Sequence, residues 1–350
     1  MKKLQTIQHL RAVAALSVVG FHAAEKGGTH FIIGAAGVDI FFVISGFIMW
    51  VIAADRPITP GRFMRDRIER IVPLYWVATT VMVLGGLAGL FPRMTLTLEH
   101  VVSSYLFVPH LSPSTGQPWP VLVQGWTLNY EMFFYILFAG ILFLQPRLRL
   151  ASLIGMLCAC VAAGALFQPQ GAVLSAYTDP ILLEFGLGML VGAWWLKSVS
   201  SSRALGIGLV IAGLCGFAFV GATLKGLHPF VLGPLGAMLM VGALMLERAG
   251  SAPRLALLGY LGDCSYSIYL WHTLAMSVVF KVAALLAVPA PAAIAIAILA
   301  GTAIGIASYE FLERPMVLML KGLRAGAQRP RPMPMLAEIF SSRLRRITAS

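Results

Sequence analysis

The chain has 350 residues, of which 59% are hydrophobic and 11% are charged, and its formal net charge is +12. The apolar stretches are as long as transmembrane helices, which excludes an ordinary soluble domain. The sequence therefore predicts an all-α fold, a polytopic membrane helix bundle.

Ten apolar segments have the length of a transmembrane helix. In chain order they are 8–25, 32–53, 72–91, 121–144, 150–168, 178–196, 204–222, 228–246, 262–286 and 290–313. A shorter apolar patch at 98–109 is bounded by histidine and proline, so we expect it to lie at the surface. The predicted outer loop that contains this patch, 92–120, is rich in proline and is expected to form an irregular cap.

The positions of lysine and arginine orient the bundle, because short cytoplasmic loops retain these residues. With a cytoplasmic N-terminus, all but four of the 26 lysines and arginines lie on the cytoplasmic side, the exceptions being Lys26, Arg93, Lys225 and Lys281. Both termini are therefore predicted to be cytoplasmic. The positive charge is expected to contact anionic lipids, and no nucleic acid partner is expected. No cleavable signal peptide is expected, because polar residues interrupt the first apolar segment.

One membrane domain, residues 1–316, is predicted, followed by a basic cytoplasmic tail, residues 317–350. Apolar residues recur at helical spacing near the end of this tail, opposite arginines, which is the pattern of an interfacial helix. The four cysteines have neither CxxC nor Cys/His ligand spacing, so no disulfide and no metal site are expected.

Two ionisable residues, Arg11 and His22, interrupt the first apolar segment. A charged side chain in the hydrocarbon region costs about 2.5–3.5 kcal/mol, so such residues indicate a functional site. Eleven residues at about 100° each make three turns plus roughly 20°, so both side chains leave one face of the helix, about 16 Å apart along its axis. One helix face thus carries a cation near one membrane surface and an imidazole deeper inside.

Acidic residues in other predicted spans lie at a similar depth to His22. Asp39 is near the outer end of the second span, and Glu131 and Glu184 enter from the same side in the fourth and sixth spans. An imidazole beside a carboxylate is a general-base arrangement, in which the carboxylate fixes the tautomer and stabilises the imidazolium. The alternative is that these residues only form interhelical hydrogen bonds that hold the bundle together.

An arginine-rich segment at 62–73 precedes the third predicted span and is interpreted as a cytoplasmic loop. Within it Arg67 and Arg70, at i and i+3, share one helical face. Paired guanidinium groups fit phosphate oxygens well. Retention of positive charge on the cytoplasmic side is the alternative explanation. Together with Arg11, these arginines favour an anionic ligand whose phosphates stay at the inner surface while another part extends toward His22.

With these features, the chain resembles the acyltransferase-3 family of integral membrane acyltransferases, and within it the exopolysaccharide-production O-acetyltransferases. The resemblance covers about residues 5–316. The matching features, in order, are Arg11 with His22, GVDIFFVISGF at 37–47, RIERIVPLYW at 67–76, WTLNYEMFFY at 126–135, EFGLGM at 184–189, SYSIYLWH at 265–272 and ERP at 313–315.

The resemblance implies transfer of an acyl group, usually acetyl from acetyl-CoA, to a hydroxyl of a cell-envelope glycan or lipid-linked saccharide. His22 then corresponds to the essential histidine, Arg11 to its partner arginine, and Arg67 and Arg70 to positions that hold the CoA donor. Acetyl-CoA is a substrate here, and no permanently bound cofactor is expected. The resemblance also implies a bacterial inner membrane location and leaves polysaccharide assembly proteins as candidate partners.

The residues expected to act beside His22 are Asp39 and Glu131. Ser45, Tyr75, Trp126 or a backbone amide is expected to meet the oxyanion. Direct transfer is favoured over a covalent serine, because no GxSxG elbow surrounds Ser45 and a Ser-Gly pair is typical of close helix packing.

His272, in the ninth predicted span, either lines the substrate cleft or forms a hydrogen bond in the core. A different class of protein, a transporter or flippase for a lipid-linked sugar or other anionic substrate, would also use buried carboxylates. It explains the arginine-rich segment less well. A structural partner in polysaccharide export would explain none of the buried ionisable residues.

Overall fold

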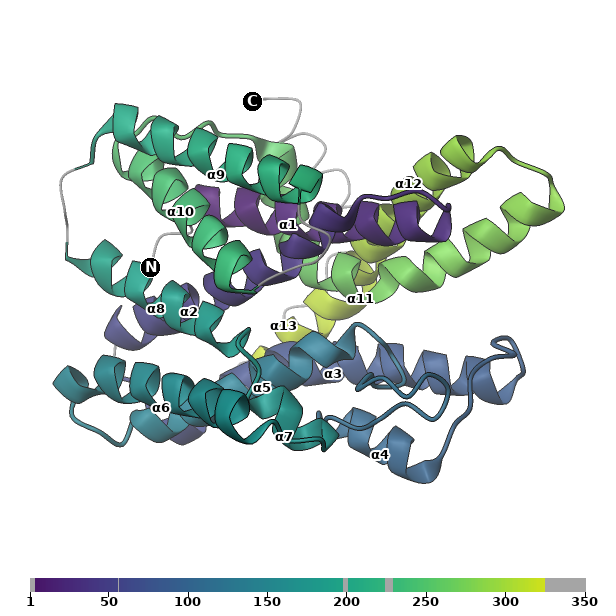
Figure 1. The fold of residues 1–350 in the computed structure, drawn as a ribbon, viewed down its shortest axis with the longest axis horizontal. Helices are drawn as coiled ribbons and strands as arrows, with labels where there is room; N and C mark the ends of the chain where they lie inside the picture. Colours follow the sequence, from purple (N-terminus) through teal and green to yellow (C-terminus); the bar gives the residue numbers. More distant parts are fainter. Residues whose placement is uncertain (1–3, 56, 198–200, 224–228, 325–350) are drawn as a thin grey trace.

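The computed structural model describes residues 4–55, 57–197, 201–223 and 229–324, and these contain helices and no β-strand. The elements are α1 (Gln5–Lys26), the 3-10 turn η1 (Ile32–Ala36), α2 (Gly37–Asp55), α3 (Pro60–Leu87), α4 (Leu98–Tyr105), α5 (Gly125–Ile141), α6 (Pro146–Phe167), α7 (Ala172–Tyr177), α8 (Leu182–Leu196), α9 (Arg203–Thr223), α10 (Pro229–Arg248), α11 (Ala256–Leu285), α12 (Ala290–Ser308), the π turn η2 (Tyr309–Glu313) and α13 (Arg314–Arg324). The predicted all-α membrane bundle is confirmed (Figure 1).

Within the part of the chain that the structure describes, eight helical stretches are long and apolar enough to cross a membrane. The protein is therefore a multi-pass membrane protein. The other two predicted spans coincide with α1, which carries several polar residues, and with α5, which has 17 residues. The count of ten spans and the cytoplasmic placement of both termini stay predictions. The interfacial helix expected near the end of the tail lies outside the described residues.

Two helix pairs around α1 and α2 form the centre of the bundle. α1 packs along α11, which also packs along α12, and α2 packs along α8. The crossing of α2 and α8 depends on two glycines: a Cβ atom on Gly46 would lie 2.0 Å from the carbonyl oxygen of Phe185, and one on Gly188 would lie 2.0 Å from that of Val43. Small residues allow membrane helices this close an approach. Gly46 is the packing site that the Ser-Gly pair predicted.

The arginine-rich segment 62–73 is helical, so its interpretation as a loop is wrong. α3 begins at Pro60 and continues through Pro73 for 28 residues. Thr59 caps the helix by accepting a hydrogen bond from the backbone N–H of Arg62. Proline at the first helical position and threonine at the N-cap are both strong start signals. The arginines therefore occupy the first turns of a membrane helix and keep fixed directions.

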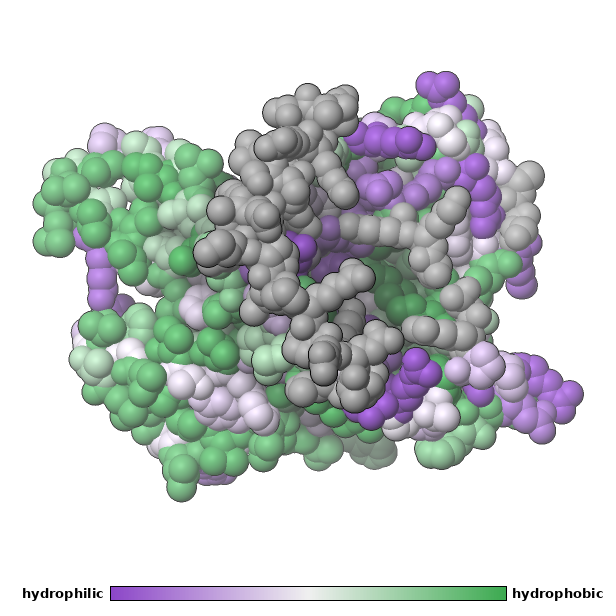
Figure 2. Space-filling model, turned by 180° about the vertical axis from the view of Figure 1, so that it is seen from behind, coloured by the Kyte–Doolittle hydropathy of each residue, from purple (hydrophilic) through white to green (hydrophobic). Residues whose placement is uncertain are grey.

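The ends of the bundle differ in polarity. Figure 1 shows α1 starting on the left and the segment with α4 on the right. Figure 2, seen from behind, shows hydrophilic residues gathered toward its right-hand edge, which is the end at which α1 begins, and hydrophobic residues over most of the remaining visible surface. This distribution agrees with the asymmetry of lysine and arginine in the sequence.

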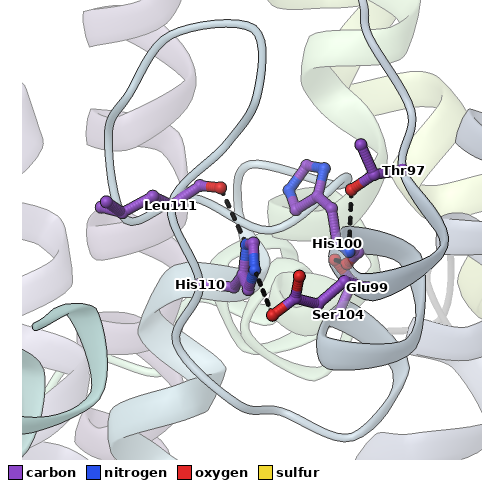
Figure 3. Close-up of polar contacts among 6 residues, drawn as sticks. All are labelled: Thr97, Glu99, His100, Ser104, His110 and Leu111. Carbon is purple, nitrogen blue, oxygen red and sulfur yellow. Dashed lines mark hydrogen bonds and ion pairs between the residues drawn. The ribbon is translucent and has the colours of Figure 1, made fainter.

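The segment between α3 and α5 is largely irregular and is tied by histidine contacts, shown in part in Figure 3. Nε2 of His110 lies 3.2 Å from Oε1 of Glu99, and Nδ1 of His110 lies 2.8 Å from the carbonyl oxygen of Leu111. His100 is buried and its Nε2 lies 2.9 Å from the carbonyl oxygen of Trp119. The segment is irregular as expected, apart from the eight-residue helix α4, and its place on the outer face stays a prediction.

Candidate active site

A cavity of about 370 Å³ lies among α1, α2, α3, α5 and α11. Its polar lining residues are Gln8, Arg11, Ser45, Arg67, Arg70, Thr127, Glu131, Tyr135, Ser265, Tyr266 and Tyr269. The structure therefore brings together five of the predicted site residues, from four helices that are far apart in the sequence.

Three guanidinium groups, those of Arg11, Arg67 and Arg70, line this one cavity. No hydrogen bond or ion pair joins any of the three to another residue in the described part of the chain, and the Nε of Arg67 is buried without a partner. Ser265 and Gln8 also hold buried oxygen atoms without partners at the cavity wall. Buried polar groups are normally hydrogen-bonded, so unpaired ones around a cavity indicate a polar ligand. Their charge favours an anion.

The carboxylate of Glu131, on α5, also lines this cavity. Its Oε1 accepts a hydrogen bond of 3.2 Å from the hydroxyl of Ser45 and a second one from Tyr135, one helical turn further along α5. Glu131 also lies within electrostatic range of Arg11 and Arg67. This carboxylate partly balances the charge of the arginines, and Ser45 donates its hydroxyl hydrogen to it.

His22 and His272 form a pair outside the cavity lining. The Nδ1 atom of His22 lies 3.4 Å from Nε2 of His272, and the ring centroids are 5.1 Å apart. His272 is fully buried on α11, whereas His22 is half-buried on α1. The ring of Tyr269 lies 6.1 Å from that of His272 and also lines the cavity, so Tyr269 separates the arginine-lined space from the histidine pair.

Asp39 is expected beside His22, but its neighbour in the structure is Glu184. Asp39 faces the carboxyl of Glu184 on α8, and no hydrogen bond or ion pair between described residues joins it to His22. Glu184 is 1% exposed, so the two carboxyl groups face each other away from solvent. The structure does not bring Asp39 and His22 into contact, because His22 faces α11 while Asp39 faces α8.

Tyr75 and Trp126 lie outside the cavity lining. The hydroxyl of Tyr75 donates to the backbone carbonyl of Ser104 at 3.0 Å, and its ring packs against Phe107, so it anchors the segment that contains α4. Trp126 is half-buried at the start of α5 and packs edge-to-face on Tyr130. Neither residue touches the three arginines or the histidine pair.

Sequence reasoning missed two contributors to the site. Tyr135 could have been found from its place four residues after Glu131, since i and i+4 positions are neighbours on a helix. Glu313, buried at the end of η2, accepts a 2.6 Å hydrogen bond from Ser267 and lies within electrostatic range of Arg11 and Arg70. It supplies a second counter-charge behind the arginines. Within the described ranges, no group of three or more histidine, cysteine, aspartate or glutamate side chains could hold a metal ion.

The fold and the site define a multi-pass helical membrane protein with a cationic cavity next to a histidine pair. The chain belongs to acyltransferase family 3, whose model, described as an acyltransferase domain, matches residues 4–310. No solved structure matches the chain.

Its curated relatives include proteins of polysaccharide and peptidoglycan modification. The chain is 54% identical to the exopolysaccharide production protein ExoZ of Rhizobium meliloti (strain 1021), with 88% of this chain and 97% of that protein covered. It is 28% identical to the peptidoglycan O-acetyltransferase OatA of Listeria monocytogenes, covering 77% of this chain and 49% of that protein. It is 29% identical to the putative peptidoglycan O-acetyltransferase YrhL of Bacillus subtilis (strain 168), and the match covers 75% of this chain and 47% of that protein. These relatives support an O-acyltransferase and not the transporter alternative.

Proposed function

We propose that the protein transfers an acetyl group from acetyl-CoA to a hydroxyl of an exopolysaccharide or of its lipid-linked precursor. The observation that carries the proposal is one cavity lined by Arg11, Arg67 and Arg70, none of which has a hydrogen-bond or ion-pair partner among the described residues, with Arg11 on the same helix as His22. The name of the ExoZ relative supports a saccharide acceptor. We place the enzyme in the inner membrane, with anionic lipids and polysaccharide assembly proteins as further partners and residues 317–350 as a basic cytoplasmic tail.

The CoA phosphates bind Arg11, Arg67 and Arg70, whose guanidinium groups form charge-assisted hydrogen bonds with phosphate oxygens. From there the pantetheine arm extends past Tyr269 toward His22. Arg11 and His22 are about 16 Å apart along α1, and an extended pantetheine arm spans a distance of that order. The thioester then reaches the imidazole while the phosphates stay at the arginines.

The reaction is a direct transfer with His22 as general base. Its imidazole accepts the proton of the acceptor hydroxyl, and the oxygen attacks the thioester carbonyl carbon. The new C–O bond forms the ester, and the C–S bond breaks with its electron pair on sulfur. The thiolate takes the proton back from the His22 imidazolium, which leaves free CoA and the neutral base.

The central test is transfer of label from radiolabelled acetyl-CoA into alkali-labile ester on envelope glycan or glycolipid. Membranes with the wild-type protein are expected to incorporate label, and membranes with an equal amount of His22→Ala protein are not. Asp39→Asn and Glu131→Gln, the other two expected catalytic positions, are assayed beside it. Normal labelling by His22→Ala would refute the general-base role.

Donor binding is tested separately with Arg67→Ala and the matched control Arg65→Ala. Arg65 is exposed on the same helix two residues earlier and does not line the cavity. Hydrogen bonds to charged groups contribute about 1.5–3 kcal/mol, so Arg67→Ala should raise the Kd for CoA about 10- to 150-fold. Arg65→Ala should leave it unchanged. If CoA raises the Tm of neither the wild-type nor the control protein, a different acyl donor is used and the proposal fails.

A further inference from the structure

The histidine pair has a feature that general-base chemistry does not require. Each ring forms a hydrogen bond with a backbone carbonyl of its own helix, and the two hydrogen bonds are of the same kind. Nδ1 of His22 lies 3.0 Å from the carbonyl oxygen of Val18, and Nδ1 of His272 lies 3.0 Å from that of Ile268. In each case the carbonyl belongs to the residue four positions earlier. A carbonyl oxygen only accepts hydrogen bonds, so Nδ1 carries the proton in both rings.

The protonation state of the other ring nitrogen of His272, Nε2, follows from this. A neutral imidazole has one N–H, so Nε2 of His272 is an acceptor. It lies 3.4 Å from Nδ1 of His22, which is a donor. The Nδ1–H of His22 is therefore shared between the carbonyl of Val18 and the ring of His272. The opposite direction, from His272 to His22, would leave an unprotonated Nδ1 at 3.0 Å from the carbonyl oxygen of Val18, where two lone pairs repel.

We infer that His272 is a positioning residue that holds His22 in the tautomer with a proton on Nδ1 and a free lone pair on Nε2. Nε2 of His22 has no hydrogen-bond partner in the part of the chain that the structure describes. It is the nitrogen able to take a proton from a hydroxyl. The inference rests on the proposed function for its catalytic meaning, but the tautomer itself is a property of the protein without substrate.

The pair has a second consequence during turnover. When Nε2 of His22 takes the acceptor proton, the ring becomes an imidazolium whose Nδ1–H still points to a neutral acceptor, Nε2 of His272. Hydrogen bonds from charged donors are stronger than those between neutral groups. His272 therefore stabilises the charged form of His22 without a carboxylate, which fits the finding that Asp39 faces Glu184 instead.

The surroundings of His272 keep this arrangement fixed. The residue is fully buried, and a Cβ atom on Gly301 of α12 would lie 3.1 Å from its Cβ, so α12 packs directly on it. The ring of Phe21 packs edge-to-face on His22, with centroids 4.8 Å apart. Tight packing limits rotation of both rings.

The test is 15N NMR of the ring nitrogens in protein labelled at its histidines and reconstituted in lipid, with His22→Gln used to assign the His22 signals. In the wild-type protein we expect Nδ1 of His22 to be protonated and Nε2 to be unprotonated. His272→Leu removes the acceptor and should mix the two tautomers. His272→Gln places an amide oxygen near the lost Nε2 and should keep the wild-type pattern.

Kinetics give the second readout. We expect His272→Leu to lower kcat for acetyl transfer about 10- to 100-fold with KM for acetyl-CoA changed less than about twofold, and His272→Gln to restore most of kcat. Ser277→Ala, on the same helix, is the control and should act like wild type. A protonated Nε2 on wild-type His22, or wild-type tautomer and kcat in His272→Leu, would overturn the inference. If no acetyl transfer is found but the tautomer is as expected, the proposed function fails and the inference on the histidines stands.

Discussion

The close crossing of α2 and α8 predicts a loss of stability on substitution of its glycines, and the magnitude of this loss follows from the distances between the two helices. Replacing Gly188 with alanine adds a Cβ that would lie 2.0 Å from the carbonyl oxygen of Val43, whereas an ordinary contact needs at least 3.4 Å. The two helices must therefore separate by about 1.4 Å. Overpacking of this kind costs about 1–3 kcal/mol, and the better helix propensity of alanine offsets less than 1 kcal/mol of it. Gly188→Ala should lower the Tm and also reduce acetyl transfer, because α2 carries Ser45 into the cavity.

The matched control is Gly155→Ala on α6, where an added Cβ meets nothing within 4 Å. This variant should be as stable as wild type or slightly more stable. Thermal unfolding in detergent, followed by intrinsic fluorescence, compares the two. The double variant Gly46→Ala/Gly188→Ala should cost less than the sum of the single variants, because one separation of the helices relieves both contacts. Equal Tm values for Gly188→Ala and Gly155→Ala would refute the reasoning.

Three further predictions concern single polar contacts. Tyr135→Phe removes one of the two hydrogen bonds to Glu131 and should destabilise the protein by about 1.5–3 kcal/mol in a chemical unfolding experiment; no change would mean that the bond is not formed. Glu247→Ala removes the carboxylate that accepts hydrogen bonds from two backbone N–H groups at the start of α1, so hydrogen exchange there should accelerate while α12 is unaffected. Burial, together with the nearby ring of His110, lowers the pKa of His100 below its usual 6.5, so its contribution to stability is present above pH 6.5 and is lost as the pH falls through the lowered pKa. Hydrogen exchange of residues 97–121 should therefore increase on acidification in wild type and increase less in His100→Gln, and identical pH dependence in both would contradict the assignment.

The arginine cluster shows how much of the site the sequence could predict. Helical spacing placed Arg67 and Arg70 on one face, and the retention of positive charge placed Arg11 at the same end of the bundle. These arguments use only local geometry and depth, and the cavity confirms that the three arginines meet. Gly46 was likewise identified correctly as a packing site.

The partner of His22 could not be predicted in the same way. Counting residues from the ends of two spans gives the depth of a side chain, and it gave similar depths for His22 and Asp39. It does not give the direction in which each helix face points, which depends on the neighbours that each helix packs against. Because α1 packs on α11 and α2 on α8, His22 meets His272 while Asp39 meets Glu184.

The boundary of α3 was missed for a related reason. A run of charged residues before an apolar span suggests a loop, although a capped helix can begin in the polar region and continue into the apolar one. Thr59 and Pro60 are start signals that precede the arginines in the sequence and could have moved the predicted boundary.

The length of α3 has a consequence for the environment in which the enzyme works. Its 28 residues span about 42 Å, against about 30 Å for the hydrocarbon core of a bilayer. The excess of about 12 Å equals roughly eight residues. With Leu87 at the opposite surface, the first turns of the helix, up to Arg67, therefore stand at the level of the lipid headgroups, and Arg70 lies about 4.5 Å deeper. Phosphates of anionic lipids then lie near the guanidinium groups to which the proposed function assigns the donor phosphates. On the proposed function, lipid phosphates compete with the donor, and we expect a membrane enriched in anionic lipid to weaken apparent donor binding without any change in the protein.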